Sequence, residues 1–331
     1  MIGAHHSGNR NRGRLLIALR WLAAAVVIGV LLRFLPLHLL AEAIRRVPVS
    51  TFLAILLGYL SAHAVGIAKW RMVVNAAGAQ LDFRTCAQCY AGGLFGTLFL
   101  PSIIGGDVIR LAVGLRRSPN PAAVLAGNVA DRCMDVAAQG GLVLVGILLV
   151  PGALPASLQG QARRALLYLG AAFVALILCA LLLYRPLLGG RSIRFRRRLA
   201  RLGHALGSVS GVPHVLLAAW LLGTAVQATF LVLTVKLAET CGLVLPLRDW
   251  FFAWPLAKLA AVLPLTQGGI GIREAALVGL LSPFGAAPHL VLAAGLVWEA
   301  VVISGGLVAG LCAFLLGRRE TAAAKSNNRE Y

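Results

Sequence analysis

Two motifs of the chain combine a proline, a pair of glycines and an arginine in the same order. The first reads LPSIIGGDVIR at 100–110, and the second reads LPLTQGGIGIRE at 263–274. In both motifs the arginine stands four residues after the second glycine, so Arg110 and Arg273 occupy matching positions. A guanidinium group fits phosphate oxygens through two parallel hydrogen bonds. Each motif therefore predicts a binding site for an anion.

The glycine pairs are expected to open a short helix in each motif. A helix N-terminus exposes unpaired N–H groups, and glycine lets a ligand approach the backbone closely. The carboxylates that follow the glycines are expected to orient the arginines or to take up protons. The motifs thus add six expected substrate-binding residues: Gly105, Gly106, Asp107, Gly268, Gly269 and Glu274. The alternative is that proline and glycine only bend two helices while the arginines extend to the membrane surface.

Acidic residues are rare, and five of the eleven fall within apolar stretches: Asp107, Asp131, Asp135, Glu274 and Glu299. A charge at the centre of a membrane helix costs at least ~2.5–3.5 kcal/mol, so these side chains are expected to face a partner or water.

A polar stripe is expected on the helix near 123–150, because Asn128, Asp131, Arg132, Asp135 and Gln139 share one helix face. Asp131 and Arg132 are expected to contact the substrate. The alternative is a structural ion pair between helices, for example Asp131 with Arg110.

The sequence Lys69-Trp70-Arg71 favours an aromatic and basic anchor at the membrane interface. Contact with a lipid headgroup is the alternative, and it places Lys69 and Trp70 among the candidate substrate-binding residues. Four further residues are interpreted as interfacial or cavity-lining: Trp254, Lys258, Trp298 and Glu299. The histidines form no metal-binding pair and Cys86-Ala-Gln-Cys89 has no second CxxC, so neither a metal nor a cofactor is expected.

The composition places these motifs within membrane helices. Of the 331 residues, 59% are hydrophobic and 13% are charged, whereas about a quarter of a soluble domain is charged. About 20 apolar residues suffice to cross the ~30 Å hydrocarbon layer. Eight apolar segments lie near 15–35, 51–68, 87–115, 123–150, 165–187, 212–238, 248–284 and 288–316. The chain is expected to be an all-α, polytopic membrane protein, which excludes a soluble enzyme, a coiled coil and a disordered protein.

The net charge of +20 comes mostly from arginines in short loops between the apolar segments. There they set the orientation and contact anionic lipids, so nucleic acid is not an expected partner. If all eight segments crossed the membrane and the N-terminus were cytoplasmic, the most basic loop, Arg185 to Arg201, would lie outside, against the positive-inside rule. If the third and seventh segments are re-entrant hairpins, that loop and the tails 1–14 and 317–331 all lie in the cytoplasm.

The hairpin topology makes the chain an inverted repeat. Residues 15–150 and 165–316 each read span, span, re-entrant hairpin, span, with opposite orientations. Broken segments at matching positions of inverted halves indicate a transport site near the middle of the membrane. A crossing by all eight segments is the alternative.

The two glycine motifs, together with Lys69-Trp70 and Asp131-Arg132, resemble the lysylphosphatidylglycerol synthase transmembrane region, a flippase-like membrane family of bacteria and archaea. The resemblance extends from about residue 15 to 316. In the lipid-aminoacylating members a soluble aminoacyltransferase domain follows this region, and the region is thought to move the modified lipid between leaflets. That domain has no counterpart here, so lysyl transfer by this chain is not expected.

The expected function is that of a flippase-type translocase in the bacterial inner membrane, for an anionic phospholipid or a polyprenyl-phosphate-linked lipid. A membrane-embedded transferase acting on a lipid headgroup is one alternative, although the chain lacks the dense carboxylate or histidine motifs of such enzymes. An accessory subunit that presents lipid to a separate enzyme is another. Expected partners are the lipid and the bilayer, and a separate lipid-modifying enzyme and a second copy of the chain are further candidates.

Overall fold

The computed structural model describes residue 22 and residues 37–100, 105–149, 193–261, 266 and 269–327. Every regular element in this part of the chain is a helix, which confirms the all-α, polytopic expectation. The helices are α2 (Leu37–Arg45), α3 (Val49–Ala76), α4 (Phe83–Thr97), α5 (Gly105–Arg117), α6 (Pro121–Leu149), α8 (Ile193–Ser210), α9 (Pro213–Thr240), α10 (Leu247–Ala260), α11 (Ile272–Leu281), the short 3-10 helix η1 (Ser282–Phe284) and α12 (Pro288–Asn327). The expected segments 15–35 and 165–187 lie outside the described residues.

Three of the described helices are long and apolar enough to cross a membrane: α3, α9 and the part of α12 from Pro288 to Arg318. Helix α6 has 29 residues, which at ~1.5 Å per residue also exceeds the hydrocarbon thickness, and the polar stripe lies in its middle. Leucines such as Leu57 on α3, Leu217 on α9 and Leu311 on α12 are exposed on the outside of the bundle. An apolar outer surface of this kind suits contact with lipid chains.

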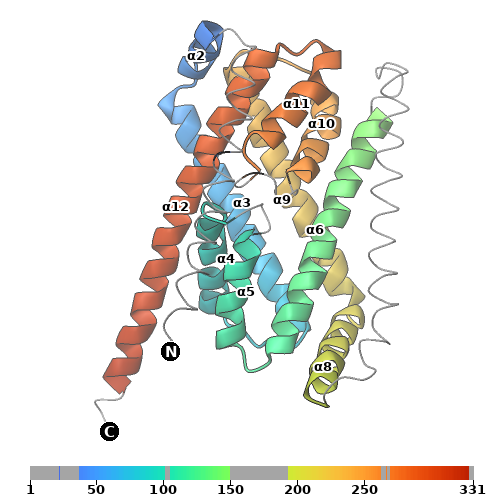
Figure 1. Ribbon diagram of the computed structural model, residues 1–331, viewed down its shortest axis with the longest axis vertical. Helices are drawn as coiled ribbons and strands as arrows, with labels where there is room; N and C mark the ends of the chain where they lie inside the picture. Colours follow the sequence, from blue (N-terminus) through green and yellow to red (C-terminus); the bar gives the residue numbers. More distant parts are fainter. Residues whose placement is uncertain are drawn as a thin grey trace, which may run out of the picture.

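The third and seventh apolar segments each fold into two helices that pack against each other, α4 with α5 and α10 with α11. In Figure 1 the pair α4–α5 (teal) lies in the lower half of the molecule, and the pair α10–α11 (orange) lies in the upper half. Each pair returns to the end of the bundle from which it started. This arrangement is the one expected of two re-entrant hairpins that enter from opposite ends.

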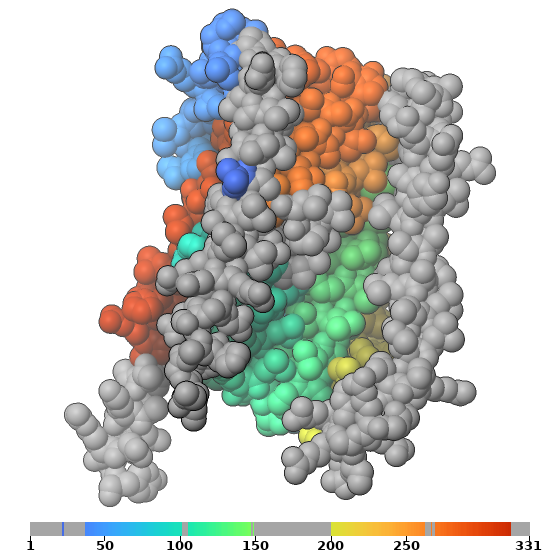
Figure 2. Space-filling model, in the orientation of Figure 1, coloured from blue at the N-terminus to red at the C-terminus, as the bar shows by residue number. Residues whose placement is uncertain are grey.

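The helices contact one another in matching pairs across the bundle. Helix α4 of the first hairpin packs against α12, α10 of the second hairpin packs against α6, and α3 packs against α9 between them. Figure 2 shows the same division on the surface, with α10 and α11 (orange) filling mainly the upper part and α5 and α6 (teal to green) mainly the lower part. These pairings are those expected of an inverted repeat. The complete eight-segment repeat and the bounds 15–150 and 165–316 stay predictions, because one segment of each half lies outside the described residues.

The ends of the bundle differ in basic residues. The connection after α5, the helix α8 and the C-terminal end of α12 lie at the lower end in Figure 1, and α2 lies at the upper end. Five arginines of α8 lie in its first nine residues, and α5 ends on Arg116 and Arg117. The lower end therefore carries these basic segments, α8 and the end of α5, and the side of the membrane that it faces stays a prediction.

Helix caps and turns explain how the hairpins begin and end. Asp82 starts α4 by accepting hydrogen bonds from the backbone amides of Arg84 and Thr85, at 3.2 and 3.3 Å. These bonds satisfy donors that have no partner inside the helix. Before α11, Gly269 and Gly271 have positive φ angles of 80° and 85°, a left-handed conformation that glycine adopts without the clash of a Cβ atom.

Candidate functional site

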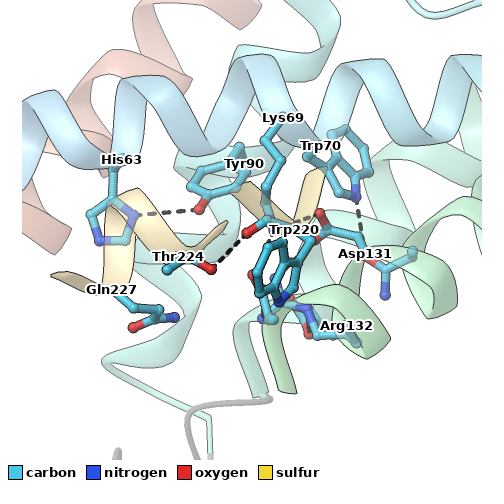
Figure 3. Close-up of polar contacts among 12 residues, drawn as sticks. His63, Lys69, Trp70, Tyr90, Asp131, Arg132, Trp220, Thr224 and Gln227 are labelled. Atoms are coloured by element: carbon cyan, nitrogen blue, oxygen red, sulfur yellow. Dashed lines mark hydrogen bonds and ion pairs between the residues drawn. The ribbon is translucent and has the colours of Figure 1, made fainter. Parts of the chain in front are cut away.

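Six charged side chains from α3, α5 and α6 meet inside the bundle. We call them the aspartate cluster: Lys69, Asp107, Arg110, Asp131, Arg132 and Asp135. Asp131 is fully buried, and Lys69 Nζ lies 2.8 Å from it and 2.5 Å from Asp135. Figure 3 shows Lys69 and Asp131 pointing toward each other from facing helices. With three cations and three carboxylates the cluster carries no net charge.

The two arginines of the aspartate cluster are bound by the same carboxylates. Arg110 lies 2.9 Å from Asp107 and 3.6 Å from Asp131. Arg132 lies 3.1 Å from Asp107, 3.3 Å from Asp131 and 3.1 Å from Asp135. The structural pair of Asp131 with Arg110, which the sequence left as an alternative, is therefore present. The stripe of α6 points inward as expected, because Asn128, Asp131 and Gln139 are buried.

Lys69 and Trp70 do not form an interfacial anchor, so that expectation is wrong. Both side chains are buried, at 3% and 0% exposure. Trp70 donates a hydrogen bond from Nε1 to Asn128 Oδ1 at 3.1 Å, and Arg110 donates to the same oxygen at 2.6 Å. The guanidinium of Arg110 also lies over the rings of Trp70 and Tyr90, at 5.1 and 5.3 Å from their centroids. The acidic stripe of α6 draws Lys69 into the bundle, because a buried carboxylate is stabilised by a nearby cation.

A second group of charges, the glutamate cluster, consists of Arg273, Glu274 and Glu299. Arg273 Nη2 lies 2.5 Å from Glu274 and 2.8 Å from Glu299. The other carboxylate oxygen of Glu274 accepts a hydrogen bond from the backbone amide of Gly271 at 2.7 Å. The N-terminus of α11 and the guanidinium of Arg273 are thus both bound to protein carboxylates. This cluster has one carboxylate more than it has cations.

Three described glycines of the two motifs, Gly105, Gly106 and Gly269, lie in close contact with protein atoms, which leave no room for a Cβ atom. A Cβ atom on Gly106 would lie 2.4 Å from the carbonyl oxygen of Gly93 on α4, and one on Gly105 would lie 2.6 Å from Leu100 Cβ. A Cβ atom on Gly269 would lie 2.7 Å from Ala261 Cβ. Close packing of the hairpins explains why these positions need glycine. Gly268 lies outside the described residues, and approach of a ligand to the glycine backbone stays a prediction.

Two cavities lie beside the clusters. The glutamate-side cavity, of about 350 Å³, is lined by Arg273 and Glu299 together with aromatic side chains. The aspartate-side cavity, of about 300 Å³, is lined by Lys69, Asp107, Arg110, Arg132 and Asp135. Gly106 contributes to the second lining as well. Asp131, Glu274 and Trp70 are buried behind these residues and line neither cavity.

The two cavities share five lining residues, which we call the shared wall: His63, Leu94, Thr97, Phe230 and Lys258. His63 packs edge-on against Tyr59 with ring centroids 4.4 Å apart, and its Nδ1 lies 3.4 Å from the hydroxyl of Tyr90, a contact visible in Figure 3. The cavities therefore adjoin each other inside the bundle.

Both cavities reach the apolar outer surface. Phe99, Ile303 and Leu307 line the glutamate-side cavity and are exposed, by 37% or more. They come from the end of the α4 segment and from α12, so this cavity opens sideways between the first hairpin and α12. Val136 on α6 is the corresponding exposed residue of the aspartate-side cavity. A lipid could place its headgroup inside such an opening while its chains stay in the hydrocarbon layer.

Sequence reasoning did not single out Lys258. The sequence indicates only that this lysine is interfacial or cavity-lining, and the structure places it in both cavity linings. A charge at membrane depth indicates a functional site for basic residues as well as for acids. Within the 248–284 segment, that signal identifies Lys258. Among the described residues no group of three or more His, Cys, Asp and Glu side chains is arranged to hold a metal ion.

Comparison with known proteins places this architecture in a family. None of the curated proteins compared with the chain matches it. The family model described as "Lysylphosphatidylglycerol synthase TM region" matches residues 15–310, which is most of the chain and includes both hairpins and both charged clusters. The chain therefore belongs to the family of lysylphosphatidylglycerol synthase transmembrane regions, a family of membrane domains with a lipid-related role.

Proposed function

We propose that the protein is a translocase that moves an anionic lipid between the leaflets of the bacterial inner membrane, with both termini in the cytoplasm. The lipid is a phospholipid or a polyprenyl-phosphate-linked lipid. The observation that carries this proposal is the pair of charged cavities that adjoin across the shared wall inside an apolar bundle.

The cavities would lower the free-energy cost of moving a charged headgroup through the membrane interior. A single charged side chain at the centre of a membrane helix costs at least ~2.5–3.5 kcal/mol, and a headgroup phosphate faces the same kind of penalty. Polar side chains in a cavity replace part of the water that the headgroup loses. Volumes of about 350 and 300 Å³ lie at the lower end of the range of small-ligand sites, ~300–1,000 Å³. The sideways openings leave the acyl chains outside.

The two hairpins lie where access of the headgroup to the interior could alternate between the two ends of the bundle. Each hairpin reaches the interior from one end of the bundle, and the aspartate and glutamate clusters belong to different hairpins, with Asp107 and Arg110 on α5 and Arg273 and Glu274 on α11. Binding near the midplane between broken segments is the arrangement found in many transporters with inverted repeats. We infer that the headgroup passes from one cavity to the other across the shared wall.

The test is transbilayer movement in liposomes that contain the purified protein. Fluorescently labelled phosphatidylglycerol, added at trace level, is bleached from outside with an impermeant reductant, and labelled phosphatidylcholine measures selectivity for the anionic headgroup. We expect protein-dependent exposure of the anionic lipid to the reductant. No acceleration over protein-free liposomes for any anionic lipid or polyprenyl phosphate tested would contradict the translocase function.

A variant of a cavity residue connects the movement to the site. Arg132 lines the aspartate-side cavity and its side chain is 39% exposed, so Arg132→Gln is expected to slow movement per folded molecule. Arg46→Gln is the matched control, because Arg46 is exposed and pairs with Glu42 on α2, away from both cavity linings. Equal rates in the two variants would exclude the aspartate-side cavity as the path.

A further inference from the structure

Lys258 has an unusual set of partners for a cation inside a membrane bundle. Its Nζ donates a hydrogen bond to Gln227 Oε1 at 2.5 Å. It also lies over two aromatic rings, 4.8 Å from the centroid of Trp254 and 5.0 Å from that of Phe230. Trp254 is itself fixed by a hydrogen bond from Nε1 to Thr234 Oγ1 at 3.1 Å. An ammonium group has three donors, and the neutral amide oxygen of Gln227 satisfies one of them.

The other cations that the described residues place inside the bundle are paired with carboxylates. Lys69, Arg110 and Arg132 contact the aspartates, and Arg273 contacts two glutamates. In the part of the chain that the structure describes, Lys258 has no carboxylate at ion-pair distance. At longer range, the carboxylate of Asp135, which lines the aspartate-side cavity with Lys258, favours the charged form of this lysine.

The position of Lys258 between the two cavities makes its lack of a nearby carboxylate, among the described residues, relevant to transport. It is the cation of the shared wall, and the other four members are His63, Leu94, Thr97 and Phe230. The hydroxyl of Thr97 already donates to the backbone carbonyl of Leu94 at 2.7 Å. A headgroup that moved from one cavity to the other would therefore pass the ammonium group of Lys258.

The aromatic contacts hold the ammonium group in place without neutralising it. A cation–π contact contributes about 0.5–2 kcal/mol, and a hydrogen bond from a charged donor to a phosphate oxygen is stronger than one to a neutral amide. A phosphate can therefore replace the hydrogen bond to Gln227 while the ring contacts remain. By contrast, a phosphate that approached Arg110 or Arg273 would have to displace a carboxylate.

We propose that Lys258 binds the phosphate of the transported headgroup where the two cavities adjoin, and that the substrate is accordingly a phosphate ester with a net negative charge. The statement that this headgroup is transported rests on the proposed translocase function, but binding of the phosphate can be tested without measuring movement. The same chemistry would recognise a soluble phosphate ester, so the source of the phosphate is an arm of the test.

The test compares Lys258→Met with Lys236→Met. Methionine keeps much of the length of lysine without its charge, and Lys236 is an exposed lysine of α9 that pairs with Glu239. Binding of short-chain phosphatidylglycerol, short-chain phosphatidylcholine and inorganic phosphate is measured on the full chain in neutral detergent. We expect Lys258→Met to weaken phosphatidylglycerol binding at least about tenfold, the loss of one charge-assisted hydrogen bond, and Lys236→Met to leave it unchanged. Lys258→Arg is expected to retain most of the binding.

Thermal stability without lipid separates a ligand-binding role from a structural one. Removing a buried charge that has no paired carboxylate is expected to leave the melting temperature unchanged or raised. Lys258→Gln is measured alongside, so that the comparison stands if the methionine variant does not fold. A lowered melting temperature in both variants, or wild-type affinity for phosphatidylglycerol in either, would overturn the proposal.

The outcomes of the binding and transport assays can be told apart. Lys258-dependent binding of phosphatidylglycerol without transbilayer movement would refute the translocase function and leave the phosphate site standing. Lys258-dependent binding of inorganic phosphate as tight as that of the lipid would support the phosphate chemistry and identify a soluble ester as its source. Equal binding of phosphatidylcholine and phosphatidylglycerol would overturn the requirement for a net negative charge.

Discussion

Asp131 is the carboxylate on which the cations of the aspartate cluster converge. Lys69 Nζ lies 2.8 Å from it, Arg132 Nη2 3.3 Å and Arg110 Nη2 3.6 Å, and its side chain is 0% exposed. Asp131→Asn removes the negative charge with little change in the size of the side chain. The variant leaves three buried or partly buried cations with two carboxylates.

The expected cost follows from what each cation keeps. Lys69 keeps Asp135 at 2.5 Å, and Arg110 keeps Asp107 at 2.9 Å. Removing one partner of a buried pair costs about 3–5 kcal/mol. Because no cation loses its last carboxylate, we expect the lower end of this range, about 3 kcal/mol. Asp135→Asn should cost less, about 1–2 kcal/mol, because the side chain of Asp135 is 19% exposed.

The free energy of unfolding is measured by titration with sodium dodecyl sulfate in mixed micelles, with tryptophan fluorescence as the signal. Adding Lys69→Met to Asp131→Asn removes one of the uncompensated cations, so the double variant should be more stable than the sum of the single effects implies, by about 1 kcal/mol. An Asp131→Asn protein within about 0.5 kcal/mol of the wild type would refute the reasoning. Transport is measured per folded molecule: a loss greater than in Asp135→Asn is expected, and wild-type transport would make the cluster purely structural.

Three further predictions address the topology, the hairpin packing and a helix cap. A cysteine at Arg201 on α8 should be shielded from an impermeant maleimide in intact cells, whereas one at the exposed Val244 between α9 and α10 should react; the reverse labelling would contradict cytoplasmic termini. Gly106→Ala should destabilise the protein by about 1–3 kcal/mol, because the added Cβ atom would clash with the carbonyl oxygen of Gly93. Gly140→Ala is the control, since a Cβ atom at Gly140 would have no neighbour within 4 Å. In the same unfolding assay this variant should leave the stability unchanged or increased. Hydrogen bonds, first from the side chain of Thr85 and then from backbone amides, lower the pKa of Asp82 from its ordinary value of 3.8. The pKa is therefore lower in the folded state than in the unfolded state. The carboxylate cap consequently stabilises α4 above about pH 4, and this stabilisation is lost as the pH falls through the folded-state pKa. Asp82→Ala should therefore cost about 1 kcal/mol at pH 7 and progressively less as the pH falls below about 4, and a cost independent of pH would exclude the carboxylate as the cap.

The pairing of the charges bears on how the arginines act in transport. Arg110 and Arg273 were expected to hold the headgroup, and in this structure both are bound to carboxylates from their own hairpin and from a neighbouring span. For either guanidinium to bind a phosphate, its carboxylates would have to move away or take up a proton. In the proposed translocase, phosphate binding by either arginine would require such a rearrangement, whereas Lys258, which has no carboxylate at ion-pair distance among the described residues, would need none.

Much of the fold could be predicted from local features of the sequence. Apolar segments near 20 residues determine membrane helices because backbone groups in lipid must be hydrogen-bonded within the segment. The proline and glycine pair that recurs in both halves marks where each hairpin breaks. The spacing of Asn128, Asp131 and Gln139 puts them on one face of α6, since helical periodicity depends only on neighbours along the chain.

The partners of these residues were decided by the tertiary structure. Lys69 and Asp131 belong to different helices and meet only because α3 packs against α6, so nothing in the sequence around Lys69 separates a buried ion pair from an interfacial anchor. The role of Gly106 depends on the approach of α4, and that of Lys258 on two cavities formed by helices from both halves. Local sequence determines which face of a helix is polar, but the identity of the facing group is a long-range property that exists only once the helices have packed.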